Sequence, residues 1–155
     1  GTFLERADNT ARLLDVKSLT AENIRDQGHD SVDDFYYWAA ILRSVSAFEI
    51  YRKVYRDVIT PDRVAELLVL RSDMPRSLSA CMGEVVDLLT KLKNSQSSKT
   101  ITQARNLMAE LRDSRIDEIL DQGLHLFLTN FLERVNAVGS GISRDFLLPM
   151  EELAA

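Results

Sequence analysis

The sequence predicts an all-α protein, a helical bundle of about six helices with one long C-terminal spine helix. Apolar residues recur every three or four positions in one segment after another, which is the spacing of an α-helix. No segment alternates apolar and polar residues with a period of two, so we expect no β-sheet. Prolines and helix-capping residues fall between the periodic segments, where helices are expected to begin.

The first helix is expected over residues 2–18, followed by a polar loop over residues 20–30 with turn character from Gly28 and His29. On the polar side of this helix, Asp8 and Arg12 are four residues apart and can form a favourable ion pair. The apolar side of the helix is formed by Leu4, Ala7, Ala11 and Leu14.

The second helix is expected to begin at residues 31–34, which resemble a capping box with Asp34 in place of the usual Glu or Gln. It is rich in aromatic residues, so we expect it to be largely buried. Ser44 and Ser46 weaken a helix locally, because their hydroxyl groups compete for backbone hydrogen bonds. A kink or a short break is therefore expected there, before the apolar pattern resumes at Phe48.

Two prolines mark the expected starts of the next helices. Thr60 and Pro61 are typical of an N-cap and a first helical residue, and they predict a short helix that ends near Leu70. Pro75 is expected to open the following helix in the same way. That helix carries an apolar side through Leu92.

A serine-rich stretch at residues 94–100 predicts an exposed loop, with Thr100 as the cap of the next helix. The spine helix is expected over residues 116–146 and is ended by Pro149. A helix of that length would be about 45 to 50 Å long at 1.5 Å per residue. Within it, Gly139-Ser140-Gly141 favours close helix packing or a bend over a phosphate-binding loop.

Length and charge limit the class of protein. A chain of 155 residues with 45% hydrophobic residues is typical of one domain, here residues 1–155. The net charge of −5 and the lack of a basic run argue against nucleic acid as a partner. The chain enters helical periodicity at Thr2 with no initiator methionine and no capping residue, so we expect a fragment of a longer protein.

The single cysteine, Cys81, lies in an apolar helical pattern and is expected to be a small core residue rather than a nucleophile. One cysteine cannot form an intrachain disulfide, which fits a reducing cytoplasm. No apolar run approaches the roughly 20 residues that span a bilayer, and no signal peptide is recognisable. We therefore expect a cytoplasmic protein with no membrane partner; self-association into a homo-oligomer stays open.

Metal and cofactor sites are not expected. His29 is typical of a solvated loop histidine, and His125 is interpreted as a hydrogen-bonded core histidine rather than a site residue. A di-metal helical bundle uses Glu-x-x-His pairs, but the residue three before His125 is Gln122. No glycine-rich phosphate loop, nucleophile elbow or zinc motif is present, so no cofactor is predicted.

Charged residues next to apolar stripes are the remaining candidates for a site. A buried Arg6 held by a carboxylate could present its remaining donors to a ligand carboxylate or phosphate, which would make Glu5 and Arg6 a site pair. We favour instead a structural ion pair between helices. On that interpretation, replacing Arg6 by alanine costs about 3 to 5 kcal/mol of stability. We also expect Glu5, Arg6, Arg43 and Glu49 to lie close together. The run from Tyr51 to Arg56 fits either an anion-binding surface or a solvated helix face.

Residues 3–16, with the sequence FLERADNTARLLDV, resemble the signature of the alpha-E family, bacterial proteins described as a predicted alpha-helical domain with a conserved ER motif. The resemblance extends to three further stretches: residues 38–44 (WAAILRS) continuing to 47–52 (AFEIYR), residues 73–77 (DMPRS) and residues 122–125 (QGLH). Family members are about twice as long, and this chain resembles their C-terminal half.

The resemblance implies an accessory role, because such proteins are often encoded beside, or fused to, an ATP-grasp type ligase and a transglutaminase-like protein. These systems are thought to make or modify peptides. The residues at family-motif positions are our candidates for binding: Glu5, Arg6, Arg12, Arg43, Ser44, Glu49, Tyr51, Arg52, Arg76 and His125.

Three hypotheses follow. The leading one is a non-catalytic helical accessory module that binds a partner enzyme, such as the ATP-grasp type ligase or the transglutaminase-like protein, or its peptide-like substrate. The alternative is an enzyme of amide-bond formation or cleavage, with Glu5 or Glu49 as acid-base and arginines that anchor a carboxylate. In the third, every polar motif only joins helices to one another.

Overall fold

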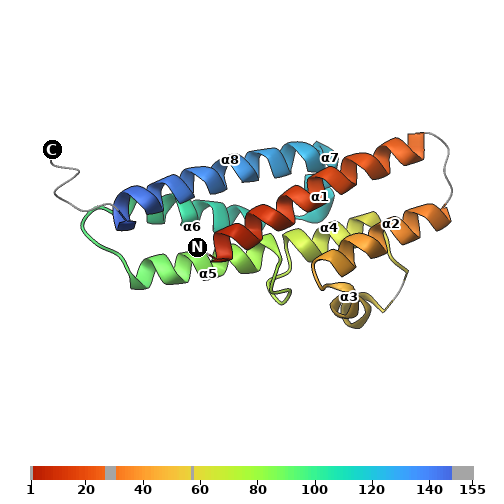
Figure 1. Ribbon diagram of the computed structural model, residues 1–155, viewed down its shortest axis with the longest axis horizontal. Coiled ribbons are helices and arrows are strands. Elements are labelled where there is room, and N and C mark those ends of the chain that lie inside the picture. The colour runs from red at the N-terminus through yellow and green to blue at the C-terminus, as the bar shows by residue number, and fades with distance from the viewer. Residues whose placement is uncertain (1, 27–30, 57, 148–155) are drawn as a thin grey trace.

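The computed structural model describes residues 2–26, 31–56 and 58–147, with side chains for residues 2–15, 35–56 and 58–146 (Figure 1). These ranges contain helices and no strand, which confirms the predicted all-α class. The elements are α1 (Thr2–Asp26), α2 (Ser31–Ser44), α3 (Phe48–Tyr55), α4 (Pro61–Val69), α5 (Leu78–Lys91), α6 (Ser98–Asp113), α7 (Ile116–Gln122), α8 (Leu124–Ile142) and a π-helical turn, η1 (Ser143–Leu147).

Four helices form a closed bundle, because α1 packs on α8, α8 on α6, α6 on α5, and α5 on α1. Figure 1 shows α1 crossing the face of the molecule from α5 at its N-terminal end to α2 at its C-terminal end. The shorter helices α2, α3 and α4 pack on one another beside the bundle, and α4 also contacts α7. The N-terminal half of α1 is therefore held between two long helices.

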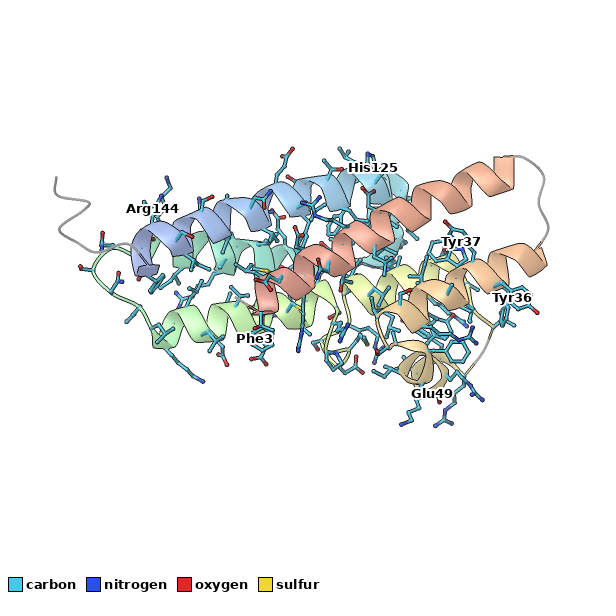
Figure 2. All side chains as sticks on the ribbon, viewed as in Figure 1. Phe3, Tyr36, Tyr37, Glu49, His125 and Arg144 are labelled. Atoms are coloured by element: carbon cyan, nitrogen blue, oxygen red, sulfur yellow. The ribbon has the colours of Figure 1, made fainter. Side chains whose placement is uncertain are left out.

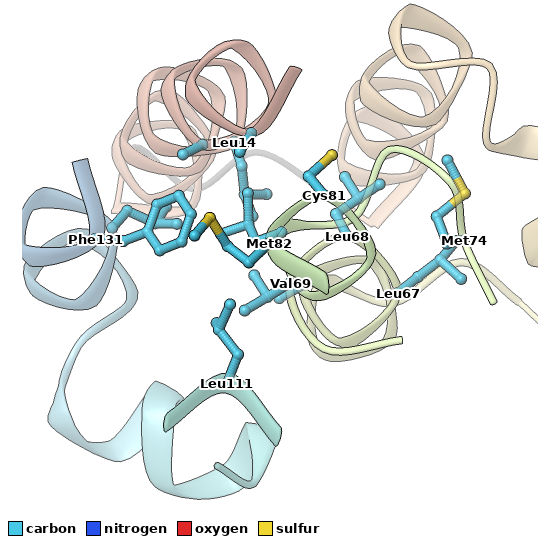
Figure 3. Close-up of a cluster of buried hydrophobic side chains, with 14 of the residues drawn as sticks. Leu14, Leu67, Leu68, Val69, Met74, Cys81, Met82, Leu111 and Phe131 are labelled. Carbon is cyan, nitrogen blue, oxygen red and sulfur yellow. The ribbon is translucent and has the colours of Figure 1, made fainter. Parts of the chain in front are cut away.

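The core lies where α1, α4, α5, α6 and α8 meet (Figure 3). Each of these helices contributes a side chain that is at most 1% exposed: Leu14, Val69, Met82, Leu111 and Phe131. Burial of a side chain of this size stabilises a fold by about 1.5 to 3 kcal/mol. On α1, Ala7 and Ala11 are fully buried beside Leu14, and their small size lets the neighbouring helices approach closely.

Helix α1 is longer than expected. It continues to Asp26, so most of the predicted loop over residues 20–30 is helical. The stretch from Leu19 to Asp26 is polar, but it contains no glycine or proline to stop a helix. Gly28 and His29 lie outside the described residues.

The predicted break after the aromatic helix is confirmed. Helix α2 ends at Ser44, and Ser46 has a positive φ of 58°, which turns the chain before α3 begins at Phe48. The Ala47 N–H donates to the Leu42 carbonyl oxygen at 2.7 Å and closes the turn. Helix α2 begins at Ser31, as predicted, and the side chains of the predicted capping box, residues 31–34, lie outside the described set.

The start of α4 is also confirmed. Pro61 is its first residue, and the Thr60 hydroxyl accepts a hydrogen bond from the Arg63 N–H at 3.3 Å. An N-cap of this kind satisfies one of the backbone donors that have no partner inside the helix.

Two predicted helix starts are wrong. Pro75 lies in the turn before α5, and Ser77 is the N-cap, with its hydroxyl accepting from the Ala80 N–H at 3.0 Å. Proline can occupy a turn as well as a first helical position, so proline alone does not fix the start. Helix α6 begins at Ser98, and Thr100 is buried inside its first turn.

The predicted spine is interrupted. Gly123, with a φ of 109°, separates α7 from α8, because glycine reaches this backbone conformation without a steric penalty. The long C-terminal helix is present from Leu124 onwards, and α8 alone is about 28 Å long at 1.5 Å per residue. A continuous helix over residues 116–146 was therefore wrong, whereas the long helix itself is confirmed.

Close packing of α6 against α8 is centred on Gly141, as the Gly139-Ser140-Gly141 motif predicts. A methyl group at Gly141 would overlap the Thr100 side chain. The Thr100 hydroxyl donates to the Asp145 carboxylate, which also accepts from Arg144 Nε at 2.9 Å. The side chain of Asn94 donates to the Asp145 carbonyl oxygen at 2.8 Å. We call Gly141, Thr100, Asp145, Arg144 and Asn94 the α6–α8 junction.

Acid should weaken this junction. The hydrogen bond from Arg144 and the hydroxyl of Thr100 lower the pKa of Asp145 below its usual range. The ionised Asp145 carboxylate therefore stabilises the fold fully above about pH 4, the pKa of an unfolded aspartate. This stabilisation is lost as the pH falls through the lower pKa that Asp145 has in the folded protein. We expect the difference in unfolding free energy between the wild type and Asp145→Asn to shrink below about pH 4. Urea unfolding across that range measures it, and a difference independent of pH would contradict the assignment.

Candidate functional site

Glu5 and Arg6 border two different hollows on different sides of α1. Consecutive residues of an α-helix point about 100° apart, so neighbours in sequence can face different partners. Glu5 lines a hollow of about 640 Å³ between α1 and α8, which we call the Glu5 hollow. Arg6 lines a hollow of about 840 Å³ between α1, α5 and α6, which we call the Arg6 hollow.

The Glu5 hollow is polar. Arg12 Nε donates to Asp8 Oδ2 at 2.8 Å, which confirms the predicted i, i+4 pair and raises the pKa of the Arg12 guanidinium. The opposite wall is formed by α8 residues with small or polar side chains, Asn136, Gly139 and Ser140. Glu5 and Arg12 are exposed at this surface, so two of the candidate residues share one hollow.

Arg6 is half-buried at the border of its hollow, and its guanidinium carbon lies 5.5 Å from the centre of the Phe3 ring. Figure 2 shows Phe3 at the N-terminal end of α1, next to α5. In the described part of the chain, no hydrogen bond or ion pair engages the Arg6 guanidinium. The predicted structural ion pair between helices is therefore wrong for Arg6, because its described contact is with the Phe3 ring of its own helix and with no acidic side chain of another helix.

Cys81 is fully buried, as predicted for a core residue. Its thiol is 3.7 Å from the Pro75 carbonyl oxygen. Burial raises the pKa of the Cys81 thiol, while the positive charges of Arg6 and Arg76 act in the opposite direction. Arg76 is exposed on the preceding turn, so Arg6 and Arg76 approach the same buried thiol from different elements.

Four candidates lie together near α3, away from the ER pair. The Arg43 guanidinium carbon lies 4.6 Å from the centre of the Phe48 ring, and the Ser44 hydroxyl donates to the carbonyl of its own helix at 2.8 Å. Arg52 Nη1 lies 3.9 Å from Glu49 Oε1, and both side chains are exposed. Figure 2 shows Glu49 on the outer side of α3.

The expected cluster of Glu5, Arg6, Arg43 and Glu49 is not formed. Glu5 and Arg6 border separate hollows, Arg43 packs on an aromatic ring, and Glu49 faces solvent beside an arginine of its own helix. Among the described side chains, no hydrogen bond or ion pair joins any two of the four. The prediction treated all charges near apolar stripes as partners, whereas the helix register sends them to different surfaces.

Tyr51 is fully buried and organises the loop between α3 and α4. Its hydroxyl donates to the Val58 carbonyl oxygen at 2.9 Å and accepts from the Thr60 N–H at 3.0 Å. Next to it, the Tyr55 hydroxyl donates to Glu66 at 2.7 Å, and burial together with this hydrogen bond raises the pKa of Tyr55. The candidate Tyr51 therefore joins structural elements rather than lining either hollow.

Removing the Tyr51 hydroxyl should loosen this loop. We expect Tyr51→Phe to lower the free energy of unfolding by about 1 kcal/mol, because it removes the partner of one backbone carbonyl and one N–H. Urea unfolding of the variant measures the loss. Tyr36→Phe is the matched control, since Tyr36 is 65% exposed and should change stability by less than about 0.5 kcal/mol. Equal effects of the two substitutions would contradict the role of the Tyr51 hydroxyl.

His125 is exposed, so the predicted core position is wrong. Its side chain is 57% exposed, and Nδ1 lies 2.6 Å from Asp15 Oδ1. Figure 2 shows His125 on the outer edge of the bundle. The pair joins α8 to α1. Asp15, the partner of His125, is not among the site residues predicted from the sequence.

Arg112 is a second residue that sequence reasoning missed. It projects from α6 into the Arg6 hollow, and its Nη2 lies 3.9 Å from the sulfur of Met108. No motif contains it, so its only sequence signal is its position four residues after Met108 on the same helix face.

Among the side chains of residues 2–15, 35–56 and 58–146, no three His, Cys, Asp or Glu are grouped so that they could hold a metal ion. None of the described helices combines the length and the apolar character needed to cross a membrane.

Comparison with known proteins identifies the family. A family model described as "a predicted alpha-helical domain with a conserved ER motif" matches residues 1–147 of the chain. No curated protein and no solved structure matches the chain. The match covers α1 to η1, including the Glu5–Arg6 pair between the two hollows. The chain therefore belongs to the alpha-E family.

Proposed function

We propose that the protein is a non-catalytic helical accessory module that binds a partner enzyme or the peptide-like substrate of that enzyme. The family resemblance suggests the partners, an ATP-grasp type ligase or a transglutaminase-like protein that makes or modifies peptides. The binding residues are the arginines at family-motif positions, with Arg6 as the principal one.

The observation that supports this proposal most directly is the lack of an ion-pair partner for Arg6 among the described residues. Its guanidinium lies at the border of a hollow and has no ion-pair partner among the described residues, although it is half-buried. A guanidinium presents a planar set of donors that binds a carboxylate through two parallel hydrogen bonds. Arg6 is therefore available to a carboxylate supplied by a ligand or a partner.

The distribution of the other candidates also favours binding over catalysis. Glu5 and Glu49, the residues considered for acid-base chemistry, lie on α1 and α3 and share no hollow. General acid-base catalysis needs groups within hydrogen-bond reach of one reacting centre. Exposed arginines at several surfaces, such as Arg12 and Arg52, are instead suited to contacts with a protein partner.

Binding to each purified partner tests the proposal. The protein is immobilised, and the ligase and the transglutaminase-like protein are titrated separately. We expect saturable binding of at least one of them, weakened about tenfold or more by Arg6→Glu, which reverses the charge in the hollow. Lys93→Glu makes the same charge change at an exposed position and should bind as the wild type does.

Two results would overturn the proposal. Binding of neither partner would remove the accessory role. Amide formation or hydrolysis by the purified protein alone, lost in Glu5→Gln, would replace it with the enzyme hypothesis.

A further inference from the structure

We infer that the Arg6 hollow binds a short peptide with a free ammonium group and free carboxylates, with Arg6 and Arg112 binding the carboxylates and Glu84 and Asp87 the ammonium group. All four residues line this one hollow. The inference deepens the proposed function and rests on it, because it names the ligand of the same site.

Two arginines at the hollow have no acidic partner among the described side chains. Arg6 comes from α1 and Arg112 from α6, so they border the hollow from different helices. Their closest described partners are uncharged, the Phe3 ring for Arg6 and the Met108 sulfur for Arg112. Nearby Arg71, by contrast, donates to both carboxylate oxygens of Asp73 at 2.9 and 2.7 Å. The charges of Arg6 and Arg112 are therefore left for a ligand.

Two carboxylates border the same hollow. Glu84 and Asp87 lie one turn apart on α5, and both are exposed. Across the part of the chain that the structure describes, neither forms an ion pair. The third acidic residue of the lining, Asp73, is held by Arg71. The hollow thus presents two cations and two anions without partners, which complements a zwitterion. A polyanion such as a phosphate chain would meet repulsion from Glu84 and Asp87.

The rest of the lining suits the body of a peptide. Phe3, Val86 and Met108 supply apolar surface, and Gly83 leaves open space, because a methyl group added there would meet nothing within 4 Å. The volume of about 840 Å³ lies within the range of about 300 to 1,000 Å³ that is usual for small-ligand sites.

A tripeptide binding experiment tests the inference. The probe is Ala-Ala-Glu, which carries one ammonium group and two carboxylates, and binding is measured by isothermal titration calorimetry. We expect millimolar or tighter binding to the wild type. Acetylating the ammonium group or amidating both carboxylates should weaken binding about tenfold or more, because each modification removes one set of ionic contacts.

A pair of glycine variants locates the bound peptide. Gly83→Leu projects a side chain into the open space of the Arg6 hollow and should abolish binding. Gly139→Leu is the matched control, because Gly139 also lies inside a helix with nothing within 4 Å of an added methyl group, but it lines the Glu5 hollow. Binding should persist in Gly139→Leu. Arg112→Gln adds a variant that fills no space, and it should weaken binding about tenfold.

Failure of this inference can be told apart from failure of the proposed function. Tripeptide binding that is absent from the wild type, or that survives in both Gly83→Leu and Arg112→Gln, would overturn the inference. If a partner enzyme is still captured through Arg6, the accessory role stands without the peptide site. If neither the tripeptide nor a partner binds, both proposals fall.

Discussion

Replacing Gly141 by alanine is expected to destabilise the protein by about 1 to 3 kcal/mol, because it overpacks the α6–α8 junction. The added methyl group would overlap Thr100 Oγ1 and lie only 3.0 Å from Cγ2 and 3.2 Å from Cβ of the same residue. Thr100 cannot move away easily, since it is β-branched and its hydroxyl is hydrogen-bonded to the buried Asp145. Either α6 and α8 separate or the hydrogen bond is lost.

Gly139→Ala is the control for the glycine substitution itself. Alanine favours a helix by about 0.5 to 1 kcal/mol over glycine, and an added methyl group at Gly139 would meet nothing within 4 Å. We therefore expect Gly139→Ala to unfold at a higher urea concentration than the wild type and Gly141→Ala at a lower one. A shift in the same direction for both variants would show that Thr100 yields readily and that the junction is not tightly packed.

Arg6→Ala should leave the protein folded and weaken its binding to the partner or the tripeptide. An arginine in a buried ion pair would cost about 3 to 5 kcal/mol on removal, but Arg6 has no such partner among the described side chains. The loss is limited to the contact with the Phe3 ring, worth about 0.5 to 1 kcal/mol at a partly exposed site. Thermal melting should therefore remain close to that of the wild type, while affinity for the partner or the tripeptide falls about tenfold or more.

Arg12→Ala controls for the loss of an arginine from α1. Arg12 is 57% exposed and paired with Asp8, and an exposed ion pair contributes about 0 to 1 kcal/mol. This variant should melt near the wild-type temperature and keep its affinity for the tripeptide, because it lines the Glu5 hollow. A fall in unfolding free energy of about 3 kcal/mol or more in Arg6→Ala would instead restore the structural interpretation of the ER pair.

Periodicity predicted the helices well but not all of their ends. The break at Ser44 to Phe48 and the start at Pro61 were recognisable, because residues that disfavour or begin a helix stand there. The apolar pattern continues through Gly123, so periodicity could not show that the chain turns there. A glycine inside a helical pattern is compatible with either a continuous helix or a break, and tertiary packing decides between them.

The sequence identified several residues of the candidate site but not their positions relative to one another. The ER pair and Arg12 were singled out from the sequence, but which hollow each residue faces depends on which helices flank α1. That arrangement is set by contacts between segments far apart in the sequence. Arg112 shows the same limit, because it becomes a candidate only when α6 is placed opposite Arg6.

The pairing of α1 with α8 has a consequence for the order of folding. Asp15 and His125, which meet across these helices, are 110 residues apart, whereas α5 and α6 are joined by a short loop. Closing a long loop costs more chain entropy than closing a short one, so the α5–α6 hairpin is expected to form early and α1 to dock late. During synthesis the side of α1 that packs on α8 therefore stays without its partner until α8 has left the ribosome.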